Sequence, residues 1–394
     1  MVLSHAPGSL VGLDRFAAPT DFPESPLSKV LREQPILLGL FLPIQAGGWT
    51  NSTLERSTDW RFDYNRDLVL RAEELGFDLV FALSQWLPKG GYGGVFNGQA
   101  LDSFTTIAAL VALTKRILLI STMHVLYGPW HPLHLAKFGA TLDHISKGRW
   151  GIKVVTGHRA VEHAMFGWDR IEHDRRYELA AEFVEVLQRL WQDEENFSFE
   201  GQSSWRMRGG YVSPKPHYGR PILVNATGSD AGIAFAGRYS DIVFITSPAG
   251  SDIQSTLEAL PAHTDKVKRS AREVGRAVRT LINPLVIARP TEKEAWDLAD
   301  RIVAHADTRS PKGFKSFESD AQAWKGREGR TDPYGQIGGN IYLVGTPEQI
   351  VEQFVGLRTA GIDGLQLSFF DFKEDLEIFG SEVLPLMKQA GLRN

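Results

Sequence analysis

Residues 36–43 read ILLGLFLP, and residues 116–123 read RILLISTM. Both stretches are apolar over nearly their whole length, so they lack the alternation of apolar and polar residues that marks a half-exposed strand. Continuous runs of this kind are typical of parallel strands that are buried on both faces. We expect strands at residues 36–43, 78–83, 117–122, 150–156, 221–226, 241–246, 281–288 and 364–369.

Amphipathic helical patterns separate these strands, for example at residues 65–75, 103–113, 133–145 and 175–191. Eight strands that alternate with helices indicate a parallel α/β fold, and a closed (β/α)8 barrel, the TIM barrel, suits their number. A doubly wound open sheet is the alternative. No strand is followed by a Gly-x-Gly-x-x-Gly turn that opens a helix, which disfavours that alternative.

The chain is expected to form one barrel domain with additions. Residues 1–35 are rich in Pro, Ser and charged side chains and are expected as an extended arm, and residues 36–394 as a single barrel. Two insertions interrupt the alternation: residues 194–220, expected as a hairpin or loop, and residues 307–340, which are long and polar. Loops of that length are often functional, so we favour a lid over the site, with an ordinary surface insertion as the alternative.

Composition excludes several classes of function. The net charge is -4 and no long basic run occurs, so neither nucleic acid nor a membrane surface is expected as a partner. The absence of Cys excludes disulfides, thiolate metal sites and cysteine nucleophiles. Neither a signal peptide nor an apolar stretch of about 18 residues is evident, so a cytoplasmic protein is the expectation.

Two motifs have the chemistry of a phosphate site. The apolar run at 221–226 leads into a turn of small residues and then a helix, which directs backbone N–H groups and the Ser229 hydroxyl at one point. A plain turn with Ser229 as helix cap is an equal alternative. Arg176 and Tyr177 begin another helix and offer a guanidinium and a phenol to a phosphate. A solvated, charged first turn is the alternative there.

The histidines do not predict a metal site. His131 with His134, and His158 with His163, have spacings of possible metal pairs, but no third ligand is evident. His124 follows the third expected strand, where barrel strands deliver side chains to the carboxyl end. It is therefore a candidate for the pocket, with a packed core histidine as the alternative.

Read together, these motifs resemble the luciferase-like two-component flavin monooxygenases, and most of all the dimethylsulfone and pyrimidine monooxygenases. The resemblance spans roughly residues 36–388. Its carriers are the motifs at 43–49, 102–105, 128–132, 141–149, 154–157, 173–177, 213–216, 228–232, 369–372 and 379–380.

The resemblance implies reduced FMN as cofactor and O2 as co-substrate. Arg176, Tyr177 and Ser229 match positions that contact the flavin phosphate. Positions that line the isoalloxazine or ribityl chain correspond to Trp86, Leu87, Lys153 and Glu162. Lys153 departs from the family pattern, since related enzymes often carry Asn there. A lysine at this position could stabilise anionic reduced flavin, or it could simply pair with Glu162.

The resemblance further implies a monooxygenase that oxygenates a small organic substrate and cleaves a C–S bond (sulfone or sulfonate) or a C–N bond (cyclic amide or heterocycle). The expected pocket includes Phe41, Trp86 and His124 as catalytic residues, together with Trp130. Closure of the 307–340 lid would keep water out.

No reductase module is visible, so a separate NAD(P)H:flavin reductase is the expected partner, and relatives suggest a homodimer or homotetramer. The alternatives are a deazaflavin (F420)-dependent oxidoreductase, a metal-dependent hydrolase and a non-catalytic flavin-binding protein.

Overall fold

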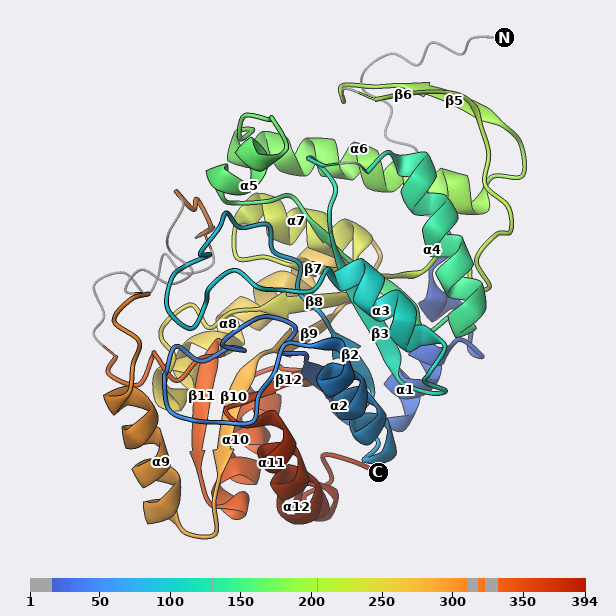
Figure 1. Cartoon of the computed structure of the whole chain (residues 1–394). Helices are drawn as coiled ribbons and strands as arrows, with labels where there is room; N and C mark the ends of the chain where they lie inside the picture. The colour runs from blue at the N-terminus through green and yellow to red at the C-terminus, as the bar shows by residue number, and fades with distance from the viewer. Residues whose placement is uncertain (1–15, 129, 204, 311–317, 323–331) are drawn as a thin grey trace.

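The computed structural model describes residues 16–128, 130–203, 205–310, 318–322 and 332–394. In this part of the chain, eight parallel strands close into a barrel (Figure 1), because the last strand pairs with the first and sets Leu38 opposite Leu365. The predicted (β/α)8 barrel is confirmed. In spatial order its strands are β1 Leu37–Phe41, β2 Leu79–Phe81, β3 Leu118–His124, β4 Trp150–Val155, β7 Ile222–Ala226, β8 Ile242–Ile245, β9 Arg279–Ile282 and β12 Gly364–Phe369.

The strands bury both of their faces, which explains their uninterrupted apolar sequences. Leu37 of β1 points into the barrel and joins a cluster with Leu79, Leu118 and Leu281. Leu38, the next residue, belongs to the larger core between strands and helices. Successive side chains of a strand point to opposite faces, so a barrel covered by helices requires apolar residues at both.

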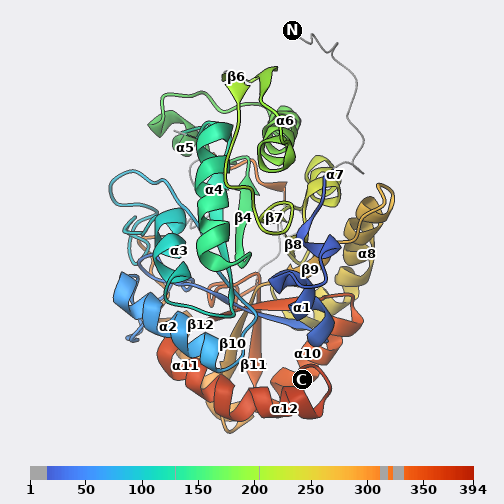
Figure 2. The same cartoon turned by 90° about the vertical axis from the view of Figure 1, so that its right-hand side faces the viewer.

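Helices surround the barrel on the outside, as Figure 2 shows from a second direction. They are α2 Phe62–Glu74, α3 Ser103–Val111, α4 Pro132–Ser146, α5 Ala160–Met165, α6 His173–Gln192, α7 Asp230–Tyr239, α8 Ile253–Arg272, α9 Glu292–Ala304, α10 Pro347–Thr359, α11 Phe372–Ile378 and α12 Leu384–Gln389, with a π-helical turn at Phe379–Val383. In the described residues, no helix combines the length and the apolar character needed to cross a membrane.

The expected strand at 281–288 is in fact two strands. β9 ends at Ile282 inside the barrel, whereas β10 (Pro284–Ala288) pairs with the end of β12 and with an additional strand, β11 (Ile341–Gly345), that the sequence analysis missed. The break falls at Asn283, whose amide side chain donates hydrogen bonds to the Gln366 carbonyl and the Ser368 hydroxyl. Pro284 then supplies no N–H group for a ladder bond.

The expected extended arm contains a helix, so that expectation was wrong for residues 26–33. α1 (Pro26–Glu33) begins after Ser25, whose hydroxyl accepts a hydrogen bond from the Ser28 N–H. Ser as cap followed by Pro in the first turn is a strong helix start. Leu27 is fully buried in the cluster inside the barrel, so α1 closes its amino end.

The two insertions differ in how much of them is described. Residues 194–220 contain an antiparallel hairpin of β5 (Phe197–Glu200) and β6 (Arg206–Gly210), which is one of the two forms expected. Of the 307–340 insertion, residues 311–317 and 323–331 lie outside the described residues. The lid function of this insertion therefore stays a prediction.

Candidate active site

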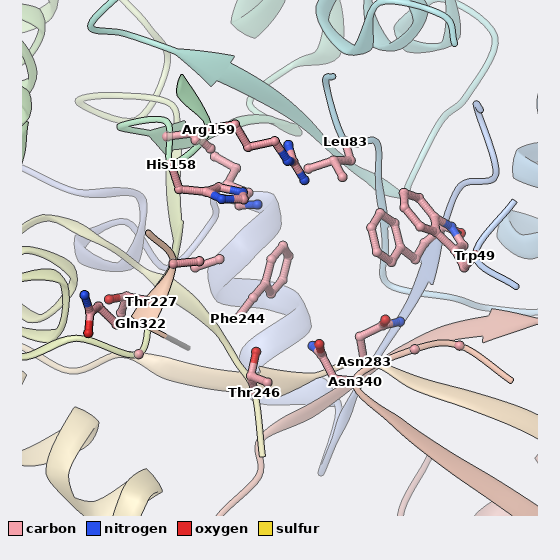
Figure 3. A pocket seen from close by; sticks show the side chains of 18 of the residues that line it. Trp49, Leu83, His158, Arg159, Thr227, Phe244, Thr246, Asn283, Gln322 and Asn340 are labelled. Atoms are coloured by element: carbon pink, nitrogen blue, oxygen red, sulfur yellow. The ribbon is translucent and has the colours of Figure 1, made fainter. Parts of the chain in front are cut away.

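A cavity of about 920 Å³ opens at the carboxyl end of the barrel strands (Figure 3). This is the end at which barrel enzymes place their active sites, and the volume is at the upper end of the usual range for small-molecule sites. Every described barrel strand contributes to the lining, and so do several described residues of the 307–340 insertion. The strand residues include Phe41, Phe81, His124, Lys153, Asn225, Phe244, Leu281 and Gln366.

One wall of the cavity is aromatic. Phe41 stacks on Trp49 with 3.9 Å between ring centroids, and it lies 4.9 Å from the ring of Phe81. Phe81 in turn meets the edge of Phe244 at 4.9 Å. These rings come from β1, β2 and β8 and from the loop after β1, so barrel closure brings them together. A continuous aromatic surface suits a flat apolar ligand and excludes water around it.

An anion cradle, formed by Arg176, Tyr177, Thr227, Ser229 and Gly232, lies at another side of the cavity. β7 ends at Ala226 and α7 begins at Asp230, with Ser229 as its cap and the Gly232 N–H donating to the Ser229 hydroxyl at 3.1 Å. A Cβ atom on Gly232 would lie 1.8 Å from Thr227 Oγ1 and 2.6 Å from Tyr177 Oη. Two hydroxyl groups therefore converge on the positive end of a helix.

Two buried polar atoms of the cradle lack a hydrogen-bond partner among the described residues, namely Thr227 Oγ1 and Arg176 Nε. The other nitrogens of the Arg176 guanidinium bind the carboxylate of Asp320 in bidentate fashion, at 3.0 and 2.9 Å. A carboxylate and a phosphate offer a guanidinium the same pair of oxygen acceptors. The unpaired atoms and the two hydroxyl groups that converge beside Gly232 therefore fit a phosphate group.

Lys153 brings a positive charge to the aromatic part of the cavity. It is 9% exposed, and its Nζ lies 5.1 Å from the centre of the Phe81 ring. Glu162, the partner considered from the sequence, instead binds Arg159 at 3.0 Å and the Tyr127 hydroxyl at 3.1 Å. Burial lowers the pKa of Lys153 to about 8, and the nearby Arg159 guanidinium adds to this effect.

His124 and His158 are neutral members of the cavity lining. Burial lowers the pKa of His124 to about 4, and its ring stacks on Tyr127 at 5.0 Å. Burial also holds the pKa of His158 well below its usual value, and its Nδ1 bonds with the Ser319 hydroxyl at 2.7 Å. At neutral pH each ring can accept one hydrogen bond and donate another.

The structure brings six of the sequence-predicted residues to one cavity: Phe41, His124, Lys153, Arg176, Tyr177 and Ser229. It places the others outside the lining, at Trp86, Leu87, Glu162 and Trp130.

Each of these four residues lies outside the cavity for a local reason. After Ser84 the chain leaves the cavity wall, so Trp86 is 39% exposed and meets the edge of Phe166. Leu87 follows it away from the cavity. Glu162 is buried behind Arg159, and Trp130 packs on Phe104 and Phe138.

Several residues of the lining were not predicted from the sequence. Thr227 and Asn225 stand inside a motif that was singled out, so their polar side chains could have been found. Asn283 and Asn340 could not, because they meet only through the pairing of β10 with β11. Figure 3 shows their amide groups beside Thr246 at the cavity.

The closed barrel, the aromatic wall and the cradle define a class of α/β-barrel proteins that hold a phosphate-bearing ligand at the carboxyl end of the strands. The family model of luciferase-like monooxygenases matches residues 37–364. The FMNH(2)-dependent dimethylsulfone monooxygenase of Pseudomonas putida is 34% identical over 372 residues, which make up 90% of this chain and 96% of that protein. The chain belongs to the luciferase-like monooxygenase family.

Two further comparisons agree with this assignment. The pyrimidine monooxygenase RutA of Yersinia enterocolitica is 32% identical over 361 residues, covering 89% of this chain and 95% of that protein. The solved structure of DmoA from Hyphomicrobium sulfonivorans superposes with a TM-score of 0.75 at 20% identity, covering 92% of this chain and 90% of that one. At that identity the superposition supports the fold alone. The resemblance read from the motifs is confirmed.

Proposed function

We propose that this chain is a monooxygenase that binds reduced FMN and uses O2 to oxygenate a small organic substrate with cleavage of a C–S or C–N bond. The anion cradle beside an aromatic cavity is the observation that carries this proposal. When bound, reduced FMN supplies the electrons that activate oxygen. The chain's own residues bind the flavin and the substrate and exclude water.

The cradle would hold the phosphate of FMN. Arg176 offers its guanidinium, Tyr177 and Thr227 offer hydroxyl groups, and the first turn of α7 offers backbone N–H groups. Ser229 fixes the beginning of that helix through its bond with Gly232. The aromatic rings of Phe41, Phe81 and Phe244 would hold the flavin ring and keep the surrounding space dry.

Substrate chemistry is proposed from the relatives and from the polar side chains of the cavity. The similar proteins include a dimethylsulfone monooxygenase and a pyrimidine monooxygenase, so a sulfone, a sulfonate, a cyclic amide or a heterocycle is the proposed class. Thr246, Asn283, Asn340 and Gln366 line one part of the cavity. Hydroxyl and amide groups of this kind donate hydrogen bonds to sulfonyl or carbonyl oxygens. Gln366 Nε2 has no partner among the described residues and is available for such a bond.

The proposal includes a partner. Reduced FMN must reach this site from elsewhere, so we propose a separate NAD(P)H:flavin reductase as its source and a homodimer or homotetramer as the working form.

The test combines binding with product analysis. Purified protein is titrated anaerobically with photoreduced FMN and then mixed with ¹⁸O2 and a panel of dimethylsulfone, alkanesulfonates and pyrimidines. We expect reduced FMN to bind and one member of the panel to be cleaved with incorporation of labelled oxygen. Failure to bind reduced FMN contradicts the proposal, and so does hydride transfer from reduced F420 without oxygen consumption.

A further inference from the structure

We infer that Lys153 provides a buried positive charge that makes this site select the reduced, anionic flavin ring over the oxidised, neutral ring. This inference rests on the proposed function. Within the described residues, the Lys153 ammonium has one aromatic ring beside it and no acid.

In the part of the chain that the structure describes, the arginine side chains that line the cavity are paired with acids. Arg159 has Glu162 at 3.0 Å, and Arg176 has Asp320 at 2.9 Å. Lys153 makes no hydrogen bond or ion pair within the described ranges, and its Nζ rests against the Phe81 ring. Among the described cations of the lining, Lys153 is therefore the one without an acidic partner. The Asp332 carboxylate, which also lines the cavity, bonds with Tyr334 and Tyr342.

The surroundings of Lys153 contribute little that could neutralise it. On β3 the nearest titratable group is His124, which is neutral at neutral pH. The chain beyond β4 contributes Arg159, which repels the ammonium, and His158, which is neutral. On β7 the residue in register with Lys153 is Val224. Burying an ammonium in such surroundings is unfavourable unless an anion joins it.

The charge lies deeper in the barrel than the cradle. Lys153 is in register with Val224, and Thr227 of the cradle follows three residues later along β7 and its turn. At a strand rise of about 3.3 Å per residue, this places the two roughly 10 Å apart along the direction of the strand. A phosphate at the cradle would therefore be bound by Arg176. Lys153 lies beside the aromatic wall, where the flavin ring would be held.

Reduced flavin carries a negative charge on its ring at neutral pH, and oxidised flavin does not. Both forms carry the same phosphate. A positive charge beside the ring stabilises the anionic form of the flavin relative to the neutral form. The preference for the reduced over the oxidised form therefore isolates the contribution of Lys153 from that of the cradle.

The experiment measures the dissociation constants of oxidised and photoreduced FMN under anaerobic conditions for the wild-type chain, Lys153→Met and Lys153→Arg. Lys153→Met is expected to weaken reduced FMN about tenfold or more, which is about 1.4 kcal/mol, and to leave oxidised FMN nearly unchanged. Lys153→Arg is expected to keep most of the preference. Retained binding of oxidised FMN shows that the Met variant is folded.

Arg176→Ala is the matched control. It removes a phosphate contact that both forms share, so it is expected to weaken both by the same factor. Equal weakening of both forms by Lys153→Met overturns the inference. The inference is also overturned if Lys153→Met leaves both flavin affinities unchanged but alters the selectivity between anionic and neutral substrates. A wild-type chain that binds neither form contradicts the proposed function itself, which is a distinguishable result.

Discussion

At the scale of single residues, Lys153 and Gly232 decide what the cavity can hold. One contributes a buried charge with no acid beside it in the described residues, and the other leaves room where a side chain would block two hydroxyl groups. Both are unfavourable choices for stability alone, since a buried ammonium is costly and Gly is a poor helix former. Residues that lower stability in this way commonly mark functional sites.

Replacing Lys153 with Met is expected to stabilise the ligand-free protein at pH 7. Its pKa is lowered to about 8 in the folded chain from 10.5. This difference in pKa between the folded and the unfolded chain corresponds to a destabilisation on the order of 3 kcal/mol at pH values where Lys153 is protonated in both. Between those two pKa values the unfolded chain binds more protons, so the stability of the wild type rises with pH there. Urea unfolding at pH 7 and at pH 10 measures the effect, and an equal difference between the two proteins at both pH values would contradict it.

The Lys153 ammonium also gives the binding of reduced FMN a pH dependence. The lysine is protonated below its pKa of about 8 and neutral above it. The preference for reduced over oxidised FMN is therefore expected to fall between pH 8 and pH 10. Anaerobic titrations across this range measure it. In Lys153→Met this decrease in preference should be absent. If the decrease persists in the variant, another group is responsible for the titration.

Gly232→Ala is expected to remove the anion cradle while keeping the fold. Its methyl group would lie 1.8 Å from Thr227 Oγ1 and 2.6 Å from Tyr177 Oη, so both hydroxyls must move. Loss of two hydrogen bonds to a charged phosphate weakens binding by about 3 kcal/mol, or roughly 100-fold. Fluorescence titration with FMN tests this. Ala234→Ser, at an exposed position on the same helix, is the control that should bind normally.

At the scale of elements, the cradle is assembled from two helix beginnings and one strand end. α6 delivers Arg176 and Tyr177, and α7 follows directly on β7. Residue Asp320 of the 307–340 insertion lies against these elements. Its N–H donates a hydrogen bond to the His158 carbonyl at 3.1 Å, and its carboxylate accepts hydrogen bonds from two nitrogens of Arg176. An incoming phosphate must compete with that carboxylate.

Asp320→Asn is therefore expected to strengthen the binding of inorganic phosphate and of FMN several-fold. Removing the carboxylate frees the Arg176 guanidinium and removes a negative charge from the cradle. A partly exposed ion pair of this kind contributes up to about 1 kcal/mol. Calorimetric titration with phosphate measures the change. Asp332→Asn is the control, because Asp332 also lines the cavity but bonds with Tyr334 and Tyr342 instead. Weaker phosphate binding in Asp320→Asn would show that the carboxylate orients the arginine.

At the scale of the whole molecule, stability and function are located at opposite ends of the barrel. At the amino end, α1 closes the interior with Leu27, and the buried pair of Arg220 and Asp241 joins the beginnings of β7 and β8 at 2.7 and 2.8 Å. The cavity lies at the carboxyl end. This division is general for barrels of this type.

Asp241→Asn is expected to lower the free energy of unfolding by about 3–5 kcal/mol, because it leaves the Arg220 charge buried without its partner. The FMN affinity of the folded protein should not change. Thermal melts and FMN titration test the two parts separately. Asp265→Asn, which breaks exposed pairs with Arg269 and Arg272, should leave the free energy of unfolding nearly unchanged. A large loss of FMN affinity in folded Asp241→Asn would contradict this separation.

By itself, the sequence determined the barrel, and it supplied Arg176, Tyr177 and Ser229 as candidates for a phosphate site. The apolar runs at residues such as 36–43 and 117–122 determine buried parallel strands, because burial on both faces leaves a continuous local pattern. The turn from Asn225 to Gly232 joins a strand to a helix within a few residues, so its anion-binding geometry is also local. The motifs of the family added the flavin and its chemistry.

Only the tertiary structure decided which of the candidate side chains meet. It set Glu162 against Arg159 and left Lys153 without an acid in the described chain, and it turned Trp86 out of the cavity. It also divided the expected strand at Asn283 and paired its second half with β11, which comes from more than fifty residues further along. Local periodicity reports burial and secondary structure. The partner of a buried charge or of a strand edge depends on how distant segments approach when the barrel closes.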